Sequence, residues 1–241
     1  MLILSLTLGS ALAAGPADFT AALQTYVSSG AVDYAGLHRD GALDGYLSWL
    51  ETAPEPADPA GKTAFWINAY NALTIDMIAD SWPLKSIRDL DDGKVWDARS
   101  FTVAGRSVTL NDIEHRILRP MGDARVHAAI NCASAGCPPI ADTPFSAAAL
   151  SAELDAASAR WMVVNGHRTG PDGSHSFNKI FDWYGEDFVK ADDCGFSLPD
   201  PKLAAAACFA SHHTDGETAA ALRAGGYTAS FHAYSWRVNA R

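Results

Sequence analysis

The chain has 241 residues, a formal net charge of −10 and a pI near 5.1, with 48% apolar and 19% charged residues. This apolar content excludes a disordered chain, and the 18 scattered Lys and Arg residues argue against a nucleic-acid-binding protein, which usually has a basic surface. The length suits one domain with at most a small appendage.

The N-terminal segment resembles a secretory signal peptide. Residues 1–13 form an apolar run that ends in small residues, and Ala11-Leu12-Ala13 fits an A-x-A cleavage site. No Lys or Arg precedes the run, so a buried N-terminal helix is the alternative interpretation. A signal peptide predicts a periplasmic or secreted protein, and no other stretch is long and apolar enough to span a membrane once the signal is removed.

Export changes how the four cysteines are interpreted, because disulfides persist in an oxidising compartment. Cys132, Cys137, Cys194 and Cys208 allow three full pairings, and the sequence alone does not choose among them. Nearest-neighbour pairing is the simplest prediction. A Cys194–Cys208 bridge would close a loop of about 15 residues, which is worth roughly 3 kcal/mol in the chain-entropy model.

The first part of the mature chain has a helical pattern. Apolar residues recur at helical spacing over 16–29 and again over 43–50, and a short strand is predicted over 31–34. Three prolines between residues 54 and 59 form a stiff connector. We therefore predict an N-terminal helical segment over 14–53 and a main α/β domain over 54–241.

The main domain alternates between helical and strand-like patterns. Its strongest helix is predicted over 62–79 and is apolar over most of its circumference, so we expect it to be buried. The other predicted elements are a β-hairpin over 101–110 that turns at 104–105, a core strand over 125–132, a closing strand over 227–238, and helices over 111–118, 145–163, 181–189, 201–211 and 217–224. The predicted fold class is α/β of the mixed α+β type, with several helices packed on a small central sheet and the N-terminal helices docked against it.

The segment over 125–139 carries the most chemistry. A predicted strand containing His127 leads to Cys132, then to a turn of small residues, and then to Cys137 followed by two prolines. Three interpretations stay open: a structural disulfide, a nucleophilic thiolate, and a metal site formed by both thiolates and His127 with a further ligand. On a regular strand His127 and Cys132 would face opposite ways, so they meet only if the strand bends.

Polar residues on predicted helices are further candidates. Asn68 and Asn71 share one face of an otherwise apolar helix, where they either tie neighbouring loops to the helix or position a substrate. Glu114 lies three residues after Asn111, which indicates a capping box, with acid/base catalysis as the alternative. Aromatic residues at 183, 184 and 188 are interpreted as core.

Several blocks of the chain, in order, resemble the family called Domain of Unknown Function 547. The blocks are FWINAYNAL at 65–73, LNDIEHRILRP at 110–120, RVHAAINCASAGCPP at 125–139, FDWYGEDF at 181–188 and YSWRVN at 234–239. Together they cover the chain from about Val32 to Asn239. Ser235 stands where the family typically has an acidic residue, so any role of that carboxylate is absent or relocated here.

The resemblance also bears on the cysteines. The resemblance implies that intracellular members of the family share this cysteine pair, so Cys132 and Cys137 are expected to be more than an adaptation to an oxidising compartment. Cys194 and Cys208 match nothing in the family pattern, so a stabilising bridge private to this chain suits them.

These observations favour an exported thiol-dependent enzyme that performs acyl transfer or hydrolysis on a small-molecule or peptide-like substrate. The alternatives are a non-catalytic binding or scaffold domain and a thiol–disulfide redox protein. The predicted catalytic residues are Cys132, His127, Cys137, Asn68, Asn71 and Glu114, with Cys132 as nucleophile and His127 as base, and the predicted substrate-binding residues are Arg125, Trp66 and Trp236. We expect one concave site where the 62–79 helix, the cysteine turn and the Glu114 helix converge. The sequence indicates neither a cofactor nor an oligomeric state.

Overall fold

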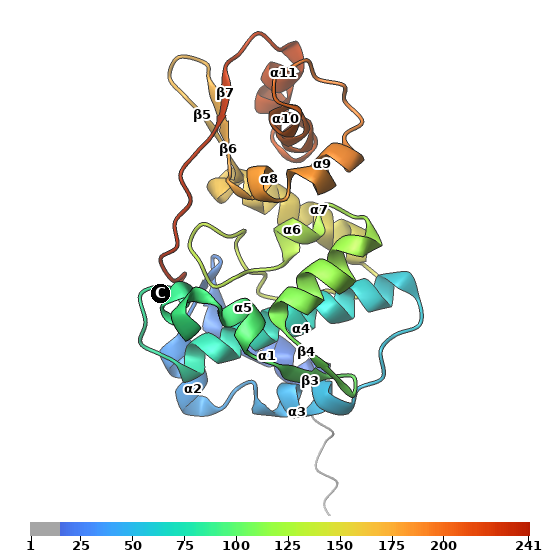
Figure 1. Cartoon of the computed structure of the whole chain (residues 1–241), viewed down its shortest axis with the longest axis vertical. Coiled ribbons are helices and arrows are strands. Elements are labelled where there is room, and N and C mark those ends of the chain that lie inside the picture. Colours follow the sequence, from blue (N-terminus) through green and yellow to red (C-terminus); the bar gives the residue numbers. More distant parts are fainter. Residues whose placement is uncertain (1–14) are drawn as a thin grey trace, which may run out of the picture.

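A computed structural model describes residues 15–241, so the predicted signal peptide over 1–13 lies outside the described residues. The described chain is mostly helical with small sheets, which confirms the mixed α+β class (Figure 1). The α-helices are α1 (Pro16–Tyr26), α2 (Tyr34–Asp40), α3 (Asp44–Thr52), α4 (Pro59–Asp80), α5 (Val95–Ala98), α6 (Val126–Ala129), α7 (Leu150–Trp161), α8 (Ile180–Trp183), α9 (Gly185–Ala191), α10 (Pro201–His213) and α11 (Gly216–Ala224). Shorter turns are η1 (Ile87–Asp89), η2 (Asp91–Gly93), η3 (Asp112–Leu118), η4 (Arg119–Met121) and η5 (Met162–Gly166), of which η3 and η5 are π-helical.

Helix α4 lies at the centre of the lower half of the molecule in Figure 1. Its start is determined locally, because the Asp58 side chain accepts a hydrogen bond from Gly61 N at 2.7 Å and Pro59 occupies the first turn. Most of its residues are buried, as the apolar pattern predicts. The helix therefore forms a rigid support from which Asn68, Tyr70 and Asn71 project.

The two predicted N-terminal helices, α1 and α3, dock on this part of the molecule, as expected. The Phe19 ring stacks on Tyr46 with centroids 4.5 Å apart, and Trp49 of α3 packs edge-on against Phe65 of α4. Helix α2 was not predicted: the strand expected over 31–34 ends at Val32, because the Asp33 side chain accepts from Gly36 N and begins a helix instead. One hydrophobic core joins all these elements.

The strands form three small sheets rather than one central sheet. Strands β1 (Val27–Ser28) and β2 (Ala31–Val32) pair, β3 (Phe101–Val103) pairs with β4 (Arg106–Val108), and β5 (His167–Thr169), β6 (His175–Phe177) and β7 (Ala229–Phe231) form the third sheet. The predicted turn at 104–105 is confirmed, and both of its residues have positive φ, as a two-residue hairpin turn requires. Because this turn is so tight, the second strand begins at Arg106 rather than at residue 108.

The core strand predicted over 125–132 is wrong. Residues 126–129 form the short helix α6 instead, which begins where the Asp123 side chain accepts from Arg125 N at 3.0 Å. After the helix, the Asn71 side chain binds the backbone at Ala129 and Asn131, so no neighbouring strand can pair there. A short apolar run fits a buried helix as well as a buried strand, and contacts distant in sequence decide between them.

The closing strand is also shorter than predicted, because its partner β6 ends at Phe177 and the chain then turns into α8. Beyond β7 the C-terminal segment runs down one side of the molecule to the N-terminal helices (Figure 1). There Tyr34 Oη donates to Asn239 Oδ1 at 2.6 Å, and Val32 pairs with Ala240. The segment thereby links the upper and lower halves.

Among residues 15–241, no helix combines the length and apolarity needed to cross a membrane.

Candidate functional site

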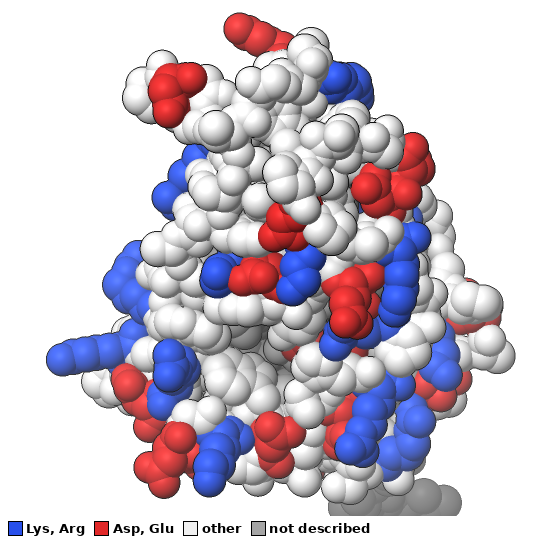
Figure 2. Space-filling model, turned by 45° about the horizontal axis from the view of Figure 1, so that its top comes forward, with Lys and Arg blue, Asp and Glu red and all other residues white. Residues whose placement is uncertain are grey.

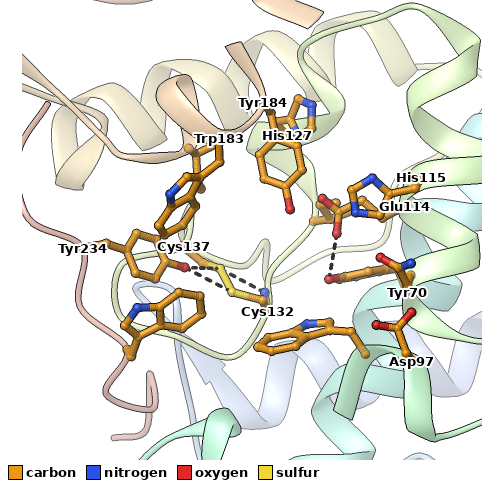
Figure 3. Close-up of a pocket in the computed structure, with 15 residues that line it drawn as sticks. Tyr70, Asp97, Glu114, His115, His127, Cys132, Cys137, Trp183, Tyr184 and Tyr234 are labelled. Atoms are coloured by element: carbon orange, nitrogen blue, oxygen red, sulfur yellow. Dashed lines mark hydrogen bonds between the residues drawn. A yellow bond between two sulfur atoms is a disulfide. The ribbon is translucent and has the colours of Figure 1, made fainter. Parts of the chain in front are cut away.

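A cavity of about 240 Å³ lies where α4, α5, η3, α6, α8 and the C-terminal segment meet (Figure 3). Its walls are mostly aromatic, and both cysteines of the 125–139 segment face it. The lining residues are Tyr70, Trp96, Asp97, Asn111, Glu114, His115, His127, Ile130, Cys132, Cys137, Ile180, Trp183, Tyr184, Tyr234 and Trp236. The cavity therefore collects side chains from six separate stretches of the chain.

Cys132 and Cys137 form a disulfide on one side of this cavity. Cys137 is buried, whereas Cys132 is half-buried. The Cys132 N–H donates to Cys137 Sγ at 3.1 Å, and the Tyr234 hydroxyl lies 3.1 Å from Cys132 Sγ and 3.0 Å from Cys137 Sγ. Since neither sulfur of a disulfide carries a proton, Tyr234 is the donor. The two sulfurs therefore differ in accessibility and in the hydrogen bonds that they accept.

Asparagine side chains hold the cysteine loop in place. Asn131 Nδ2 donates to Pro138 O at 2.7 Å, and Asn131 Oδ1 accepts from Ala133 N. From outside the loop, Asn165 Nδ2 donates to Cys137 O and Asn178 Nδ2 donates to Gly136 O, both at 2.9 Å. These hydrogen bonds from three buried amides to the loop backbone hold the loop in one conformation, so the disulfide is presented in one orientation.

Gly136 explains how the C-terminal segment reaches the disulfide. A Cβ atom at this position would come within 2.8 Å of the Tyr234 ring and of Ser235 N, closer than real Cβ contacts allow. The absence of a side chain lets Gly136 N donate to Ser235 O at 2.9 Å. The glycine between the cysteines therefore permits the contact that places Tyr234 on the sulfurs.

The predicted cap at Asn111 and Glu114 is wrong, and the correction changes how Glu114 is interpreted. The reciprocal cap is formed two residues earlier, where Thr109 Oγ1 accepts from Asp112 N and Asp112 Oδ2 accepts from Thr109 N, both at 3.0 Å. Glu114 is thus not used as a cap. It is 7% exposed, lines the cavity from the π-helical turn η3, and accepts from Tyr70 Oη at 3.3 Å.

Three tyrosine hydroxyls surround the cavity near this carboxylate. Figure 3 shows the Tyr184 hydroxyl pointing into the cavity toward Glu114, with Tyr70 on the other side of the carboxylate. Burial, reinforced by the negative charge of Glu114, raises the pKa of Tyr70, Tyr184 and Tyr234. All three phenols therefore stay protonated at neutral pH and serve as hydrogen-bond donors.

A second polar network lies behind Tyr184. His127 Nε2 is 2.9 Å from Asp187 Oδ2, and Arg119 binds both carboxylate oxygens of Asp187 at 2.6 and 3.3 Å. The hydrogen bond from His127 and the pairing with Arg119 lower the pKa of the Asp187 carboxyl. The His127 ring stacks on Tyr184, and within residues 15–241 no hydrogen bond joins His127 to either cysteine sulfur. Its lining position, however, puts His127 and the disulfide on the same cavity.

The structure places four predicted site residues away from this cavity. Asn68 exchanges hydrogen bonds with the backbone of Phe145, and Asn71 binds the backbone of Ala129 and Asn131, so both amides tie loops to α4. Arg125 pairs with Asp123 and Asp155. Trp66 donates to Glu55 and is fully buried. Only Asn71 therefore contacts the backbone beside Cys132, and neither amide lines the cavity.

Of the predicted residues, Cys132, Cys137, His127, Glu114 and Trp236 do line the cavity. Sequence reasoning missed Tyr70, Trp96, Asp97, Tyr234 and Asp187, and it assigned Trp183 and Tyr184 to the core. Trp183 is instead 45% exposed at the cavity, whereas Phe188 is buried as expected. The signal that could have found Trp183, Tyr184 and Tyr234 is their presence in the blocks at 181–188 and 234–239.

One group of side chains within residues 15–241 has the geometry of a metal site, with ligand atoms of Asp193, Cys194, Cys208 and His212 all within 4.8 Å of one another. Cys194 and Cys208 form the predicted disulfide, so their sulfurs are not free thiolates in this state. The metal interpretation of Cys132, Cys137 and His127 is disfavoured in the same way, because both sulfurs are bonded to each other and His127 Nε2 binds Asp187.

Comparison with known proteins adds a family and no activity. No curated protein and no solved structure matches the chain. The sequence model of a family described as "Protein of unknown function, DUF547" matches residues 55–162, a range that includes Tyr70, Glu114, His127 and both cysteines of the cavity. Trp183, Tyr184, Tyr234 and Trp236 lie beyond the matched range. The chain therefore carries a DUF547 domain over residues 55–162, a range that contains the first three of the five sequence blocks.

Proposed function

We propose that this protein is an exported thiol-dependent enzyme whose reacting group is the Cys132–Cys137 pair, and that the pair works by thiol–disulfide exchange with a small substrate. The observation that carries the proposal is the difference between the two sulfurs. Half-buried Cys132 faces a cavity, while buried Cys137 accepts hydrogen bonds from Cys132 N and Tyr234 Oη. An accessible sulfur beside a protected one is what a substrate thiol needs in order to attack one sulfur and displace the other.

The reaction can be followed bond by bond. A substrate thiolate attacks Cys132 Sγ, the Cys132–Cys137 bond breaks, and its electron pair passes to Cys137 Sγ. The Cys132 N–H and the Tyr234 O–H are in place to stabilise the thiolate that leaves. A second substrate thiolate then attacks the substrate sulfur of the mixed disulfide, which releases a substrate disulfide and Cys132 as a thiolate. Two substrate thiols are oxidised and the protein disulfide is reduced; a substrate disulfide drives the reverse reaction.

Acyl transfer or hydrolysis is a second candidate, favoured by the His127–Asp187 pair on the same cavity. After reduction of the disulfide, Cys132 would be the nucleophile, and His127, oriented by Asp187, would be the base. This candidate needs His127 to come within hydrogen-bond distance of the Cys132 sulfur. It predicts covalent labelling of reduced Cys132 by an activated ester, with labelling lost in His127→Ala.

Trapping of the mixed disulfide tests the exchange proposal. The Cys137→Ser variant leaves Cys132 without its partner, so glutathione disulfide should form a stable adduct on Cys132, detected by intact mass and peptide mapping. The matched control is Cys208→Ser, which leaves Cys194 as a single thiol outside the cavity. Faster adduct formation on Cys132 than on Cys194 supports exchange. Equal or slower formation contradicts it and favours the non-catalytic binding or scaffold interpretation.

Export is part of the same proposal. Two disulfides over residues 15–241 are consistent with an oxidising compartment, and a periplasmic or secreted location agrees with the predicted signal over 1–13. We expect the mature chain to begin near Ala14, which intact-mass measurement of material from the periplasm or the culture medium would check. Full-length protein retained in the cytoplasm would contradict this prediction.

A further inference from the structure

The cavity has a wall of aromatic rings contributed by three segments that are distant in sequence: α5, α8 and the C-terminal segment. The ring centroids of Trp183 and Trp236 lie 5.6 Å apart, those of Tyr234 and Trp236 4.7 Å, and those of Trp183 and Tyr234 4.9 Å. Trp96 packs edge-on against Trp236 at 6.1 Å from the other side. Four large rings thus form one continuous surface, and Trp183 remains 45% exposed on it. An exposed indole that lines a cavity is available to contact a ligand.

The charges at this cavity are of one sign. Two carboxylates line it, Asp97 and Glu114, and the lining residues within the described chain include no Lys or Arg. Two cations lie behind the lining rings: Arg119 is bound to Asp187 through both carboxylate oxygens, and the Arg88 guanidinium lies 5.2 Å from the centroid of the Trp236 ring. On the face shown in Figure 2, acidic and basic side chains are interspersed, which differs from the lining of the cavity, where both charged residues are acidic.

Glu114 is the central charge of the site. It is 7% exposed and makes no ion pair with Lys, Arg or His within residues 15–241. Its contacts are with phenols: Tyr70 donates to it at 3.3 Å, and the Tyr184 hydroxyl points toward it. A buried carboxylate supported only by neutral donors gains considerably from a cationic partner, because its own charge is desolvated.

Indole and phenol rings complement the same kind of ligand. The negative face of an aromatic ring attracts a cation placed over it, most strongly for Trp, and boxes of such rings are a recurrent device for binding substituted ammonium groups. The cavity volume of about 240 Å³ lies below the ~300–1,000 Å³ common for larger ligands, which restricts the occupant to a small molecule. The protein's net charge of −10 would also favour the approach of a cation.

We propose that the cavity binds a small organic cation of the substituted-ammonium class, with its charge between Glu114 and the wall formed by Trp96, Trp183, Tyr234 and Trp236. The inference deepens the proposed function and rests on it in one respect: the natural substrate of the Cys132–Cys137 pair is then a thiol or disulfide that also carries an ammonium group. Binding of the cation itself does not require the disulfide to react.

Equilibrium binding tests the charge requirement directly. Choline and its neutral isostere 3,3-dimethylbutanol have nearly the same shape and differ in charge, so they are compared by calorimetry or tryptophan fluorescence on the full chain. We expect choline to bind at least about tenfold more tightly. Equal affinity of the two probes, or no binding of choline, overturns the proposal.

Variants at two lining positions, Glu114 and Trp183, test which side chains bind the cation. Glu114→Gln keeps the shape of the side chain and should weaken choline at least about tenfold, while Glu186→Gln, an exposed change of the same kind outside the cavity, should leave the affinity unchanged. Trp183→Leu should also weaken choline, and Trp183→Phe should restore part of the affinity. Because Trp183 is substantially exposed, its variants keep the test valid should Glu114→Gln fail to fold. Wild-type affinity in a folded Glu114→Gln or Trp183→Leu protein contradicts the proposal.

Exchange kinetics separate this inference from the proposed function. Reduction of the Cys132–Cys137 disulfide is measured with cysteamine, 2-mercaptoethanol and 3-mercaptopropionate at matched thiolate concentration. The fastest reaction should be with the cationic thiol and the slowest with the anionic one. Exchange at one common rate overturns the cation inference and leaves the exchange function standing. Choline binding without any exchange supports the cation inference and overturns the exchange function.

Discussion

Tyr234 is the side chain that connects the C-terminal segment to the disulfide. Its hydroxyl lies 3.0 Å from Cys137 Sγ although the two residues are 97 positions apart. A hydrogen bond to a charged sulfur contributes more than one to a neutral sulfur, on the order of 1.5–3 kcal/mol. The bond is therefore expected to matter more for the departing thiolate than for the resting disulfide.

This difference gives the first prediction. Tyr234→Phe should slow reduction of the Cys132–Cys137 disulfide by about tenfold or more, while the free energy of unfolding falls by only about 1 kcal/mol. Stopped-flow or quenched mass measurements with a single thiol give the rate, and urea unfolding gives the stability. Tyr227→Phe removes the same atom from a tyrosine that packs on His175 outside the cavity and serves as the control. An unchanged rate in Tyr234→Phe would show that the hydroxyl does not assist the leaving sulfur.

Asp187 yields a prediction about pH. The hydrogen bond from His127 and the pairing with Arg119 lower the pKa of this carboxyl in the folded protein. A lowered pKa contributes stability above the unfolded value of about 3.9, and the contribution is lost as the pH falls through the folded value. Asp187→Asn should therefore be less stable than wild type at pH 6, and the difference should shrink between pH about 4 and 2.

Unfolding free energies measured across that range check the prediction. Glu186→Gln, an exposed neighbour, is the control and should follow the wild-type curve. A stability difference for Asp187→Asn that stays constant down to pH 2 would mean that the ion pair is not the source of the effect. Retained exchange in a folded Asp187→Asn protein would also separate the His127 network from the chemistry of the sulfurs.

Residue-level patterns predicted part of the site. The thiols of Cys132 and Cys137 and the imidazole of His127 could be singled out because they interrupt an apolar run. Trp236 could be singled out because it lies in the block at 234–239 that resembles the family. The position of Tyr234 could not be derived, since no local pattern encodes a contact between residues 97 positions apart. The role of Glu114 was misjudged for a local reason. The helix cap was predicted two residues too late in the chain, so Glu114 was interpreted as a capping residue although it lines the cavity.

At the level of elements, α4 and α6 are joined by one side chain. Asn71 accepts from Asn131 N and donates to Ala129 O, both at 2.9 Å and both buried. These two hydrogen bonds satisfy backbone groups that a neighbouring strand would have paired if residues 125–132 had formed a β-strand. It therefore sets the path of the chain that leads into Cys132.

Removal of the Asn71 amide tests this link between α4 and α6. Asn71→Ala leaves a buried N–H and a buried carbonyl unpaired, which should lower the free energy of unfolding by about 2–4 kcal/mol. Denaturant unfolding measures the loss, and Asn68→Ala is a comparison in which the amide serves the backbone of Phe145 instead. If Asn71→Ala kept its stability but lost exchange or choline binding, the amide would be acting on the substrate and not on the fold.

Local signals predicted those elements whose ends are set locally. Helix α10 begins at Pro201 as predicted, where Asp200 accepts from Lys202 N, and the β3–β4 turn follows from Ala104-Gly105. Helix α4 was predicted from residue 62 but begins at Pro59, because Asp58 accepts from Gly61 N and caps the helix there. The chain over 125–132 and the end of β7 are set by distant partners, Asn71 and the short strand β6. Hydrophobic periodicity contains no information about such partners, which is why the strand predicted over 125–132 was wrong and the closing strand was predicted too long.

For the whole molecule, the matched domain does not contain the entire cavity. Residues 55–162 supply the disulfide, Glu114, Tyr70 and one ring of the aromatic wall, Trp96, whereas the other three rings come from α8 and the C-terminal segment. That segment is anchored at its end by Tyr34 and Val32 of the N-terminal part. The first and last parts of the described chain therefore act together to position Tyr234 and Trp236. The division of the chain into an N-terminal helical segment over 14–53 and a main domain over 54–241 stays a prediction.

The second disulfide stabilises the far end of the molecule without contributing to the cavity. Cys194–Cys208 ties the loop after α9 to α10, and its polar neighbours Asp193, Ser211 and His212 do not line the cavity. Cys194→Ser should lower the free energy of unfolding by roughly 3 kcal/mol, the value expected for a loop of about 15 residues, and leave the exchange rate at Cys132 unchanged. Urea unfolding and the thiol exchange assay measure the two quantities on the same protein. A parallel loss of Cys132 exchange in folded Cys194→Ser would show that the two disulfides are coupled, through α10 and the helices packed on it, and that the cavity does not function independently of the C-terminal helices.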